Sequence, residues 1–274
     1  MPESVAVRVR DALADATAAL AAAECDSPRL DAELLLADAL AVERARLVLA
    51  AGDEVDPGAL ERFNELIARR AAREPVAYIL GRKAFRQITL AVDRRVLIPR
   101  PETELLVEVG LALPPGARAV DVGTGSGAIA LALKDERPDL LVRGVDVSAD
   151  ALAVARANTR TLRLEVEFVQ ADLLEGVPRP IDAVLANLPY VESDAALAPE
   201  IARYEPGGAL FAGPDGLAAV RRLIGMLEGV RLAALEVGAG QAAAVAALLA
   251  QAGFRAVDRL RDLAGHERVV VGRR

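Results

Sequence analysis

The sequence predicts an α/β fold, with a mostly parallel sheet of seven strands, an antiparallel edge on that sheet, and a small helical bundle before it. Three observations support this prediction. Apolar residues recur at helical spacing up to about residue 72, short apolar runs alternate with helical stretches from residue 118 onward, and two strand-like runs close the chain. Strands that alternate with helices are typical of a parallel sheet covered on both faces.

Residues 1–72 are expected to form a bundle of about four helices. Ser27 and Pro28 stand in the order of a helix N-cap followed by proline at the first helical position. The apolar residues that follow them recur at the spacing of one helix face. The residues expected on that face are Leu30, Leu34, Ala37 and Ala41.

Residues 73–98 are expected to form a β-hairpin linker. The run "PVAYILGRKAFRQITLAVDRRVLIP" changes from helical spacing toward alternation and is rich in β-branched and aromatic residues. Such a run is typical of paired strands. Residues 99–274 then remain for the second domain.

The second domain contains five runs expected to be buried strands, "ARAVDVG", "LVRGVDV", "EVEFVQ", "IDAVLAN" and "RLAALEVG". Helical stretches such as "AIALALKD" and "SADALAVARANTR" lie between them. The last two runs, "GFRAVDRL" and "ERVVVGRR", are joined by a polar loop. They predict an antiparallel edge on the sheet.

Composition excludes several classes of protein. The formal charge of −7 over 274 residues argues against broad affinity for nucleic acid, because phosphate binding depends on Lys and Arg. The single cysteine, Cys25, excludes an internal disulfide, and one His with one Cys makes a zinc site improbable. No run approaches the roughly 20 apolar residues that a membrane helix requires, and the N-terminus lacks a secretory signal, so a cytoplasmic location is expected.

A glycine-rich loop, "VDVGTGSGAIALAL", lies between a predicted strand and a predicted helix. Glycines at this position let the backbone approach a ligand, although a bare glycine triplet is equally consistent with an ordinary tight turn. The G-x-G-x-G spacing differs from the dinucleotide fingerprint. The next strand ends in Asp146, where a carboxylate is placed to bind ribose hydroxyls.

The tetrapeptide "NLPY" follows the fourth strand of the series. Out of context it is a proline turn. At the carboxyl end of a parallel strand, where ligands collect, the Asn187 side-chain oxygen and the Leu188 carbonyl are two acceptors that could hold the N–H groups of an amide or exocyclic amine. Pro189 confines Leu188 to extended geometry, and Tyr190 could stack on a planar target group.

Together, the loop, the acid and the sheet with its edge resemble the Rossmann-like, class I S-adenosylmethionine-dependent methyltransferases. The resemblance implies that Asp121 and the glycine loop face the methionine part of the cofactor, Asp146 the ribose, and Asp172 with Leu173 the adenine. An ordinary solvated loop acid is the less favoured interpretation of Asp172 alone. The implied cofactor-binding residues are Asp121, Gly123, Thr124, Gly125, Ser126, Gly127, Asp146, Asp172, Leu173 and Asn187.

Longer motifs resemble the HemK/PrmC family of protein-(glutamine-N5) methyltransferases. The most discriminating are "YILG" and "IPRPETE", followed by "EPGGALFAGPDGL", "LEVGAGQ" and "RDLAGHERVVVG". The resemblance implies that class I peptide chain release factors are the protein substrate, that the glutamine of their Gly-Gly-Gln motif is methylated, and that the protein is a monomer. It also implies that residues 1–72 recognise the substrate and that residues 98–104 help close the cofactor pocket.

The family's usual motif is Asn-Pro-Pro-Tyr, and this chain has Leu188 at its second position. Because that position is expected to act through its backbone carbonyl, the leucine side chain is expected to be incidental. The resemblance then implies Asn187, Leu188, Pro189 and Tyr190 as the residues that hold the target amide.

Two other functions are compatible with the motifs. An adenine-N6 DNA or RNA methyltransferase could use the same Asn-x-Pro-Tyr acceptors, but the acidic charge and 3% aromatic content disfavour base flipping and polyanion binding. A non-catalytic cofactor-binding protein is the third possibility. The intact glycine loop, Asp146 and Asn187 disfavour it.

Overall fold

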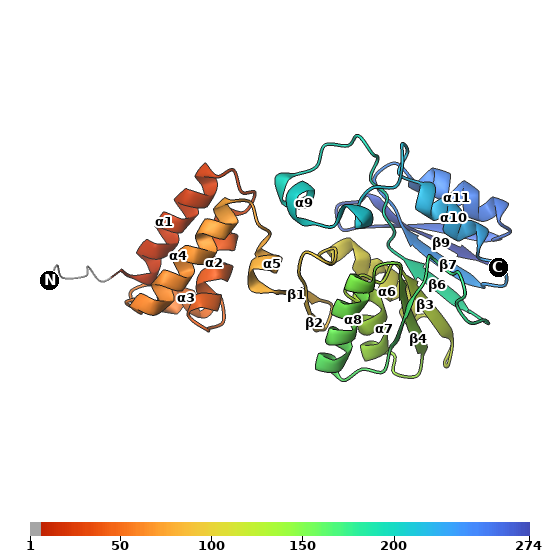
Figure 1. Cartoon of the computed structure of the whole chain (residues 1–274), viewed down its shortest axis with the longest axis horizontal. Coiled ribbons are helices and arrows are strands. Elements are labelled where there is room, and N and C mark those ends of the chain that lie inside the picture. Colours follow the sequence, from red (N-terminus) through yellow and green to blue (C-terminus); the bar gives the residue numbers. More distant parts are fainter. Residues whose placement is uncertain (1–6) are drawn as a thin grey trace. The chain divides into compact units, whose positions relative to one another are not determined.

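The computed structural model describes residues 7–274 and divides them into two compact units (Figure 1). The helical unit contains the chain up to Gly81 together with Ala198–Tyr204. The sheet unit contains Arg82–Leu197 and Glu205–Arg274. The helical unit therefore includes a short segment that follows the Asn-Leu-Pro-Tyr motif in the sequence.

The helical unit is a bundle whose helices bury aliphatic side chains and Phe63. Asp56 caps its longest helix by accepting hydrogen bonds from the backbone N–H groups of Gly58 and Ala59. Its helices are α1 (Val9–Ala22), α2 (Pro28–Ala39), α3 (Arg46–Leu49), α4 (Pro57–Ala71), α5 (Val76–Leu80) and the inserted α9 (Pro199–Tyr204).

The buried face of α2 is not the expected one. Of the residues expected on it, Ala37 is buried, but Leu30 is 43% exposed. The core side is formed by Ala32, Leu35 and Leu36, and the carboxylate of Asp31 is also buried. Because consecutive leucines satisfy the helical spacing on more than one face, tertiary packing decides which face is buried.

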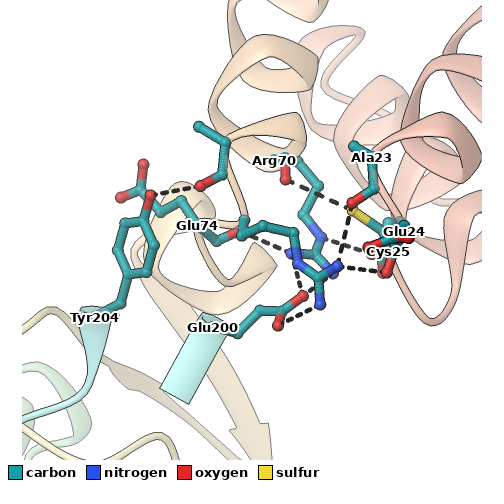
Figure 2. Close-up of polar contacts among 10 residues, drawn as sticks. Ala23, Glu24, Cys25, Arg70, Glu74, Glu200 and Tyr204 are labelled. Atoms are coloured by element: carbon teal, nitrogen blue, oxygen red, sulfur yellow. Dashed lines mark hydrogen bonds and ion pairs between the residues drawn. The ribbon is translucent and has the colours of Figure 1, made fainter. Parts of the chain in front are cut away.

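Arg70 of α4 forms the polar centre of the helical unit (Figure 2). Its side chain donates hydrogen bonds to Asp31 (2.7 Å) and to Glu200 of α9 (3.0 Å). Arg73 donates to the other Glu200 oxygen (2.7 Å), and the Tyr204 hydroxyl donates to the Ala72 carbonyl (2.9 Å). These bonds attach the inserted helix to α4 and to the two residues that follow it. The Cys25 thiol, near the same group, is buried and lies 3.6 Å from the Arg70 carbonyl oxygen.

The segment expected as a hairpin linker contains both a helix and a hairpin. Helix α5 belongs to the helical unit, so this unit extends to Gly81, beyond the expected boundary at residue 72. The antiparallel hairpin of β1 (Arg82–Phe85) and β2 (Ile88–Ala91) belongs to the sheet unit. Buried Asn158 joins β2 to the sheet unit by exchanging hydrogen bonds with the backbone of Ala91 (2.8 and 3.1 Å).

The sheet has seven strands in the order β5-β4-β3-β6-β7-β9-β8, which confirms the predicted fold. Strands β3 to β7 are parallel, and β9 is antiparallel to both of its neighbours. The strands are β3 (Arg118–Val122), β4 (Leu141–Asp146), β5 (Glu167–Gln170), β6 (Ala183–Ala186), β7 (Leu232–Glu236), β8 (Ala256–Arg261) and β9 (Glu267–Arg273).

Helices cover both faces of the sheet, with α6, α7 and α8 on one side and α10 and α11 on the other (Figure 1). Because β3 lies between β4 and β6, the strand order reverses at β3, and a crevice forms there at the carboxyl ends of the strands. The helical elements are η1 (Pro101–Thr103), α6 (Glu104–Leu111), α7 (Ala128–Glu136), α8 (Ala149–Leu162), η2 (Gly207–Ala209), α10 (Ala218–Gly225) and α11 (Ala242–Gln251).

None of the helices within residues 7–274 combines the length and apolar character that crossing a bilayer requires.

Candidate functional site

A cavity of about 610 Å³ lies in the sheet unit where β3, β4 and β6 end. It brings together most of the residues expected from the sequence. Those that line it are Gly123, Thr124, Gly125, Ser126, Asp146, Asp172, Leu173, Asn187, Leu188 and Pro189. Asp121, Gly127 and Tyr190 were expected at the site but are not among its lining residues.

The glycine loop is tied to the neighbouring strand by its backbone. The N–H groups of Gly123 and Thr124 both donate to the Val145 carbonyl (2.8 and 2.9 Å). Gly125 has φ +55°, and a Cβ added to it would lie in open space. Gly127 has φ +85°, and a Cβ added to it would come within 2.9 Å of the Leu131 side chain. Gly125 therefore keeps the loop open to a ligand, and Gly127 allows the loop to pack closely on α7.

Asp146 stands at the end of β4 and is fixed by two backbone groups. Its Oδ2 accepts a hydrogen bond from the Gly125 N–H (2.9 Å), and its Oδ1 accepts one from the Ser148 N–H (2.9 Å). A carboxylate oxygen can accept more than one hydrogen bond, so both oxygens remain able to bind hydroxyl groups. The carboxylate is thus positioned beside the glycine loop on the wall of the cavity.

Asp121 is buried beneath the loop and acts on the loop itself. Its Oδ2 accepts hydrogen bonds from the Thr124 hydroxyl (2.6 Å) and the Ala130 N–H (3.2 Å), while its Oδ1 is buried without a partner. Burial raises the pKa of Asp121 to about 7, although the two hydrogen bonds by themselves would lower it. Side chains alternate along a strand, so Asp121 points to the α7 side of the sheet and Val122 points to the other.

Asp172 and Leu173 line the cavity after β5. The Asp172 carboxylate forms an ion pair with Arg222 of α10, with Oδ2 accepting a hydrogen bond across 2.7 Å. Leu173 has a positive φ of 55°, which turns the chain at this point. The carboxylate therefore has a protein partner, which the sequence did not indicate.

Asn187 follows β6, and its amide nitrogen donates to the Thr103 hydroxyl (3.0 Å). Leu188 is only 4% exposed and belongs to the apolar core between the sheet and helices α10 and α11. The side chain therefore has a packing role in the fold, and the expectation that it is incidental to holding the substrate stays a prediction. An added Cβ on Gly123 would meet Leu188 Cδ2 at 3.0 Å, so the leucine packs directly against the glycine loop.

Tyr190 packs beside the chain segment that follows β7 and is not among the cavity-lining residues. Its carbonyl accepts a hydrogen bond from Gln241 Nε2 (3.0 Å), and an added Cβ on Gly238 would meet the Tyr190 ring at 3.2 Å. Burial raises the pKa of Tyr190 to about 12, so the phenol is neutral at physiological pH.

Several residues that line the cavity could not be predicted individually from the sequence. Pro99 and Thr103 lie within the "IPRPETE" motif, which was expected to help close the pocket as a whole. Phe211, 41% exposed, comes from the "ALFAGPDGL" segment and reaches the cavity because Val191 pairs with it in a parallel bridge. The sequence alone could not predict that Phe211 lines the cavity, because this depends on the pairing of residues 191 and 211 in the folded chain.

Known proteins resemble the chain at the level of whole domains. Residues 11–81 match the family model described as PrmC N-terminal domain, and residues 101–203 match the methyltransferase small domain. The hMettl16 catalytic domain, solved in complex with an RNA hairpin of the MAT2A 3′UTR, has a TM-score of 0.57 and 18% identity, covering 76% of this chain and 80% of that one. This likeness supports the fold alone.

Relatives match over nearly the full length. A release factor glutamine methyltransferase of Mycolicibacterium smegmatis is 41% identical, over 97% of this chain and 98% of the relative. A release factor glutamine methyltransferase of Cereibacter sphaeroides is 44% identical, over 97% of this chain and 99% of the relative. With both domains matched and the glycine loop, Asp146 and Asn187 on one cavity, the chain belongs to the release factor glutamine methyltransferase family.

Proposed function

We propose that this protein transfers a methyl group from S-adenosylmethionine to the side-chain amide nitrogen of the glutamine in the Gly-Gly-Gln motif of class I peptide chain release factors. The observation that carries the proposal is the position of Asn187 and Leu188 on the same cavity as the glycine loop and Asp146. The two relatives described above are named for this substrate class.

The residues of the cavity fit the cofactor. The loop is open at Gly125, Asp146 has acceptor oxygens for ribose hydroxyls, and the volume of about 610 Å³ suits a ligand of nucleoside size or larger. Asp172 and Leu173 are proposed for the adenine and the Gly123–Gly127 loop for the methionine part. When bound, S-adenosylmethionine supplies an electrophilic methyl group on a sulfonium.

Asp121 is proposed to act on this site through the loop, because its carboxyl holds Thr124 and the N-terminus of α7. Its unpaired, buried Oδ1 leaves one acceptor beneath the loop unsatisfied. A buried carboxyl with one unpaired oxygen can respond to a cationic ligand nearby, since a positive charge favours the ionised form of the carboxyl.

The residues of the tetrapeptide are proposed to hold the amide. A glutamine side-chain nitrogen is a poor nucleophile because its lone pair is delocalised into the carbonyl. Two acceptors, Asn187 Oδ1 and the Leu188 carbonyl, can hold its two N–H groups and stabilise the positive charge that develops on nitrogen. Pro189 restricts the Leu188 backbone. Tyr190 is proposed to contribute a planar surface next to this position.

The helical domain, residues 1–72, is proposed to recognise the release factor, and the protein is proposed to act as a monomer without direct contact to nucleic acid. The net charge of −7 supports a protein substrate over a polyanion.

The proposal is tested by methyl transfer from labelled S-adenosylmethionine. We expect label on a full-length class I release factor and none on the same factor with the Gly-Gly-Gln glutamine changed to alanine. Duplex DNA and an RNA hairpin serve as competing acceptors. Label on nucleic acid, or equal label on the altered factor, contradicts the assignment.

A further inference from the structure

Glu236 is a buried acid at the carboxyl end of β7, beside the strand that carries Asn187. In the β6–β7 pairing Ala186 is opposite Leu235, so the next residues along the two parallel strands are Asn187 and Glu236. Glu236 is 2% exposed, and its Oε2 is buried without a partner. Burying a carboxylate without a partner for each oxygen costs free energy, so a buried acid at this position indicates a function beyond packing.

The Thr103 hydroxyl connects the two residues. It accepts the hydrogen bond from Asn187 Nδ2 (3.0 Å). A hydrogen bond with Thr103 lowers the pKa of Glu236, and because an ionised carboxylate can only accept, we infer that the hydroxyl donates its hydrogen to Glu236. A hydroxyl has one hydrogen to donate. Once that hydrogen is committed to Glu236, only an acceptor lone pair remains for Asn187, and the NH₂ end of the asparagine must face Thr103.

We propose that Glu236 is a positioning residue for methyl transfer, which through Thr103 fixes the orientation of the Asn187 side chain and leaves Oδ1 as the acceptor for the substrate amide. The inference rests on the proposed function. Within residues 7–274 no protein donor is paired with Asn187 Oδ1. If the side chain turned by half a rotation, it would present NH₂ to an incoming N–H group, and the contact would become repulsive.

The charge state of Glu236 decides whether this arrangement persists. Burial raises the pKa of Glu236 to about 7, although the hydrogen bond with Thr103 by itself would lower it. Other charged or titratable groups around it are Glu102, Arg100, Arg268 and the Tyr190 phenol. The ionised carboxylate can only accept, whereas the neutral acid can donate to Thr103, which releases the Thr103 hydrogen and lets the hydroxyl donate to Asn187 Oδ1 instead.

A purely structural role for Glu236 makes a different prediction. In that case its loss lowers stability and leaves the turnover of folded enzyme unchanged. The positioning role predicts a loss of turnover at constant cofactor affinity, together with a change in the pH profile.

Thr103→Val and Thr103→Ser form a matched pair, since valine keeps the shape of threonine and serine keeps its hydroxyl. For Thr103→Val we expect kcat on the release factor to fall about 10- to 100-fold, with the dissociation constant for S-adenosylmethionine within about threefold of wild type. Thr103→Ser is expected to retain kcat within about threefold. Equal turnover in both variants overturns the proposal.

Glu236→Gln tests the charge. Wild-type kcat, at saturating cofactor, is expected to rise as the pH increases through about 7, and this rise is expected to disappear in Glu236→Gln. The double variant Thr103→Val with Glu236→Gln is expected to be no slower than the slower single variant, because both changes break one chain of bonds. Additive losses, or an unchanged pH profile, overturn the proposal.

A third readout does not depend on activity. The NMR signal of the Asn187 side-chain amide can be assigned by its absence in Asn187→Ala. We expect this signal to shift between pH 6 and pH 8 in wild type, because the titration of Glu236 is centred near pH 7. In Glu236→Gln we expect no such shift. If the wild-type protein transfers no methyl group to release factors, the proposed function is wrong. The NMR measurement still shows whether Glu236 acts on Asn187 through Thr103. If Glu236→Gln does not fold, the Thr103 pair decides it.

Discussion

Glu200 in α9 accepts a hydrogen bond from Arg70 in α4 across 3.0 Å, and 130 positions of sequence separate the two residues. Burial by itself would raise the pKa of Glu200, but hydrogen bonds from Arg73 and Arg70 lower it below its ordinary value. The ion pair therefore remains charged at neutral pH. It secures within the helical unit a segment that follows the Asn-Leu-Pro-Tyr tetrapeptide in the sequence.

Glu200→Gln is expected to loosen this segment, because it leaves Arg73 without a charged partner and weakens one of the two charged contacts of Arg70. We expect the free energy of unfolding of the helical unit to fall by about 1 to 3 kcal/mol. Hydrogen exchange of the peptide containing residues 198–204 should accelerate. The exposed acid Glu65 provides the control, and Glu65→Gln should change neither quantity. Unchanged exchange in Glu200→Gln would show that the inserted helix is held by other contacts.

Stability should decrease with rising pH because of Asp121. Its pKa is about 7 in the folded protein and 3.8 in a model peptide. The folded protein thus binds more protons than the unfolded chain between these values, and stability falls as the pH rises through this window. With about 1.4 kcal/mol per pKa unit, the loss from this group is on the order of 4 kcal/mol by pH 8.

The measurement is denaturant unfolding followed by circular dichroism at pH 5 and pH 8. Asp121→Asn is expected to flatten the pH dependence, and the slope that remains is assigned to Glu236, whose pKa is also about 7. Asp139→Asn is the control. A hydrogen bond from Arg137 holds the pKa of Asp139 at about 2, so this change alters the pH dependence of stability only below about pH 4 and leaves the slope between pH 5 and pH 8 unaltered. An unaltered slope in Asp121→Asn would mean that this carboxyl is ionised in the folded protein.

The sheet could be predicted from the sequence because its strands are buried on both faces. β6, with four buried residues in succession, appears in the sequence as an uninterrupted apolar run. The face of α2 could not be predicted, because its leucines fit two faces and the ion pair of Asp31 with distant Arg70 helps to decide between them.

The candidate site could be predicted in part for a similar reason. Gly125, Asp146 and Asn187 stand directly at strand ends, so the topology brings them together. Asp121 was misplaced because strand alternation turns its side chain away from the cavity. A charged residue inside the run "RLAALEVG" was a signal for Glu236, but its connection to Asn187 depends on Thr103, which only the folded chain places between them.

Asn187→Ala separates holding the amide from holding the cofactor. Loss of Oδ1 removes an acceptor for the substrate amide, so kcat should fall by roughly 100- to 1000-fold. Affinity for S-adenosylmethionine should stay within several-fold, as measured by calorimetry. Asn64→Ala, at an exposed position, is the control and should leave both values unchanged. An equal loss of cofactor affinity in Asn187→Ala would place this residue in the cofactor pocket instead.

Leu188 tests whether the tetrapeptide acts through its backbone. Its buried side chain packs against the glycine loop, so Leu188→Ala should lower the free energy of unfolding by about 2 to 5 kcal/mol. Leu188→Met, which conserves volume, should cost less than about 1.5 kcal/mol. The Leu188 carbonyl persists in both variants. At a temperature where both remain folded, kcat should therefore fall far less than in Asn187→Ala. If Leu188→Ala reduced kcat as severely as Asn187→Ala while the methionine variant did not, the side chain would be needed to aim the carbonyl, and packing and chemistry at this position would be coupled.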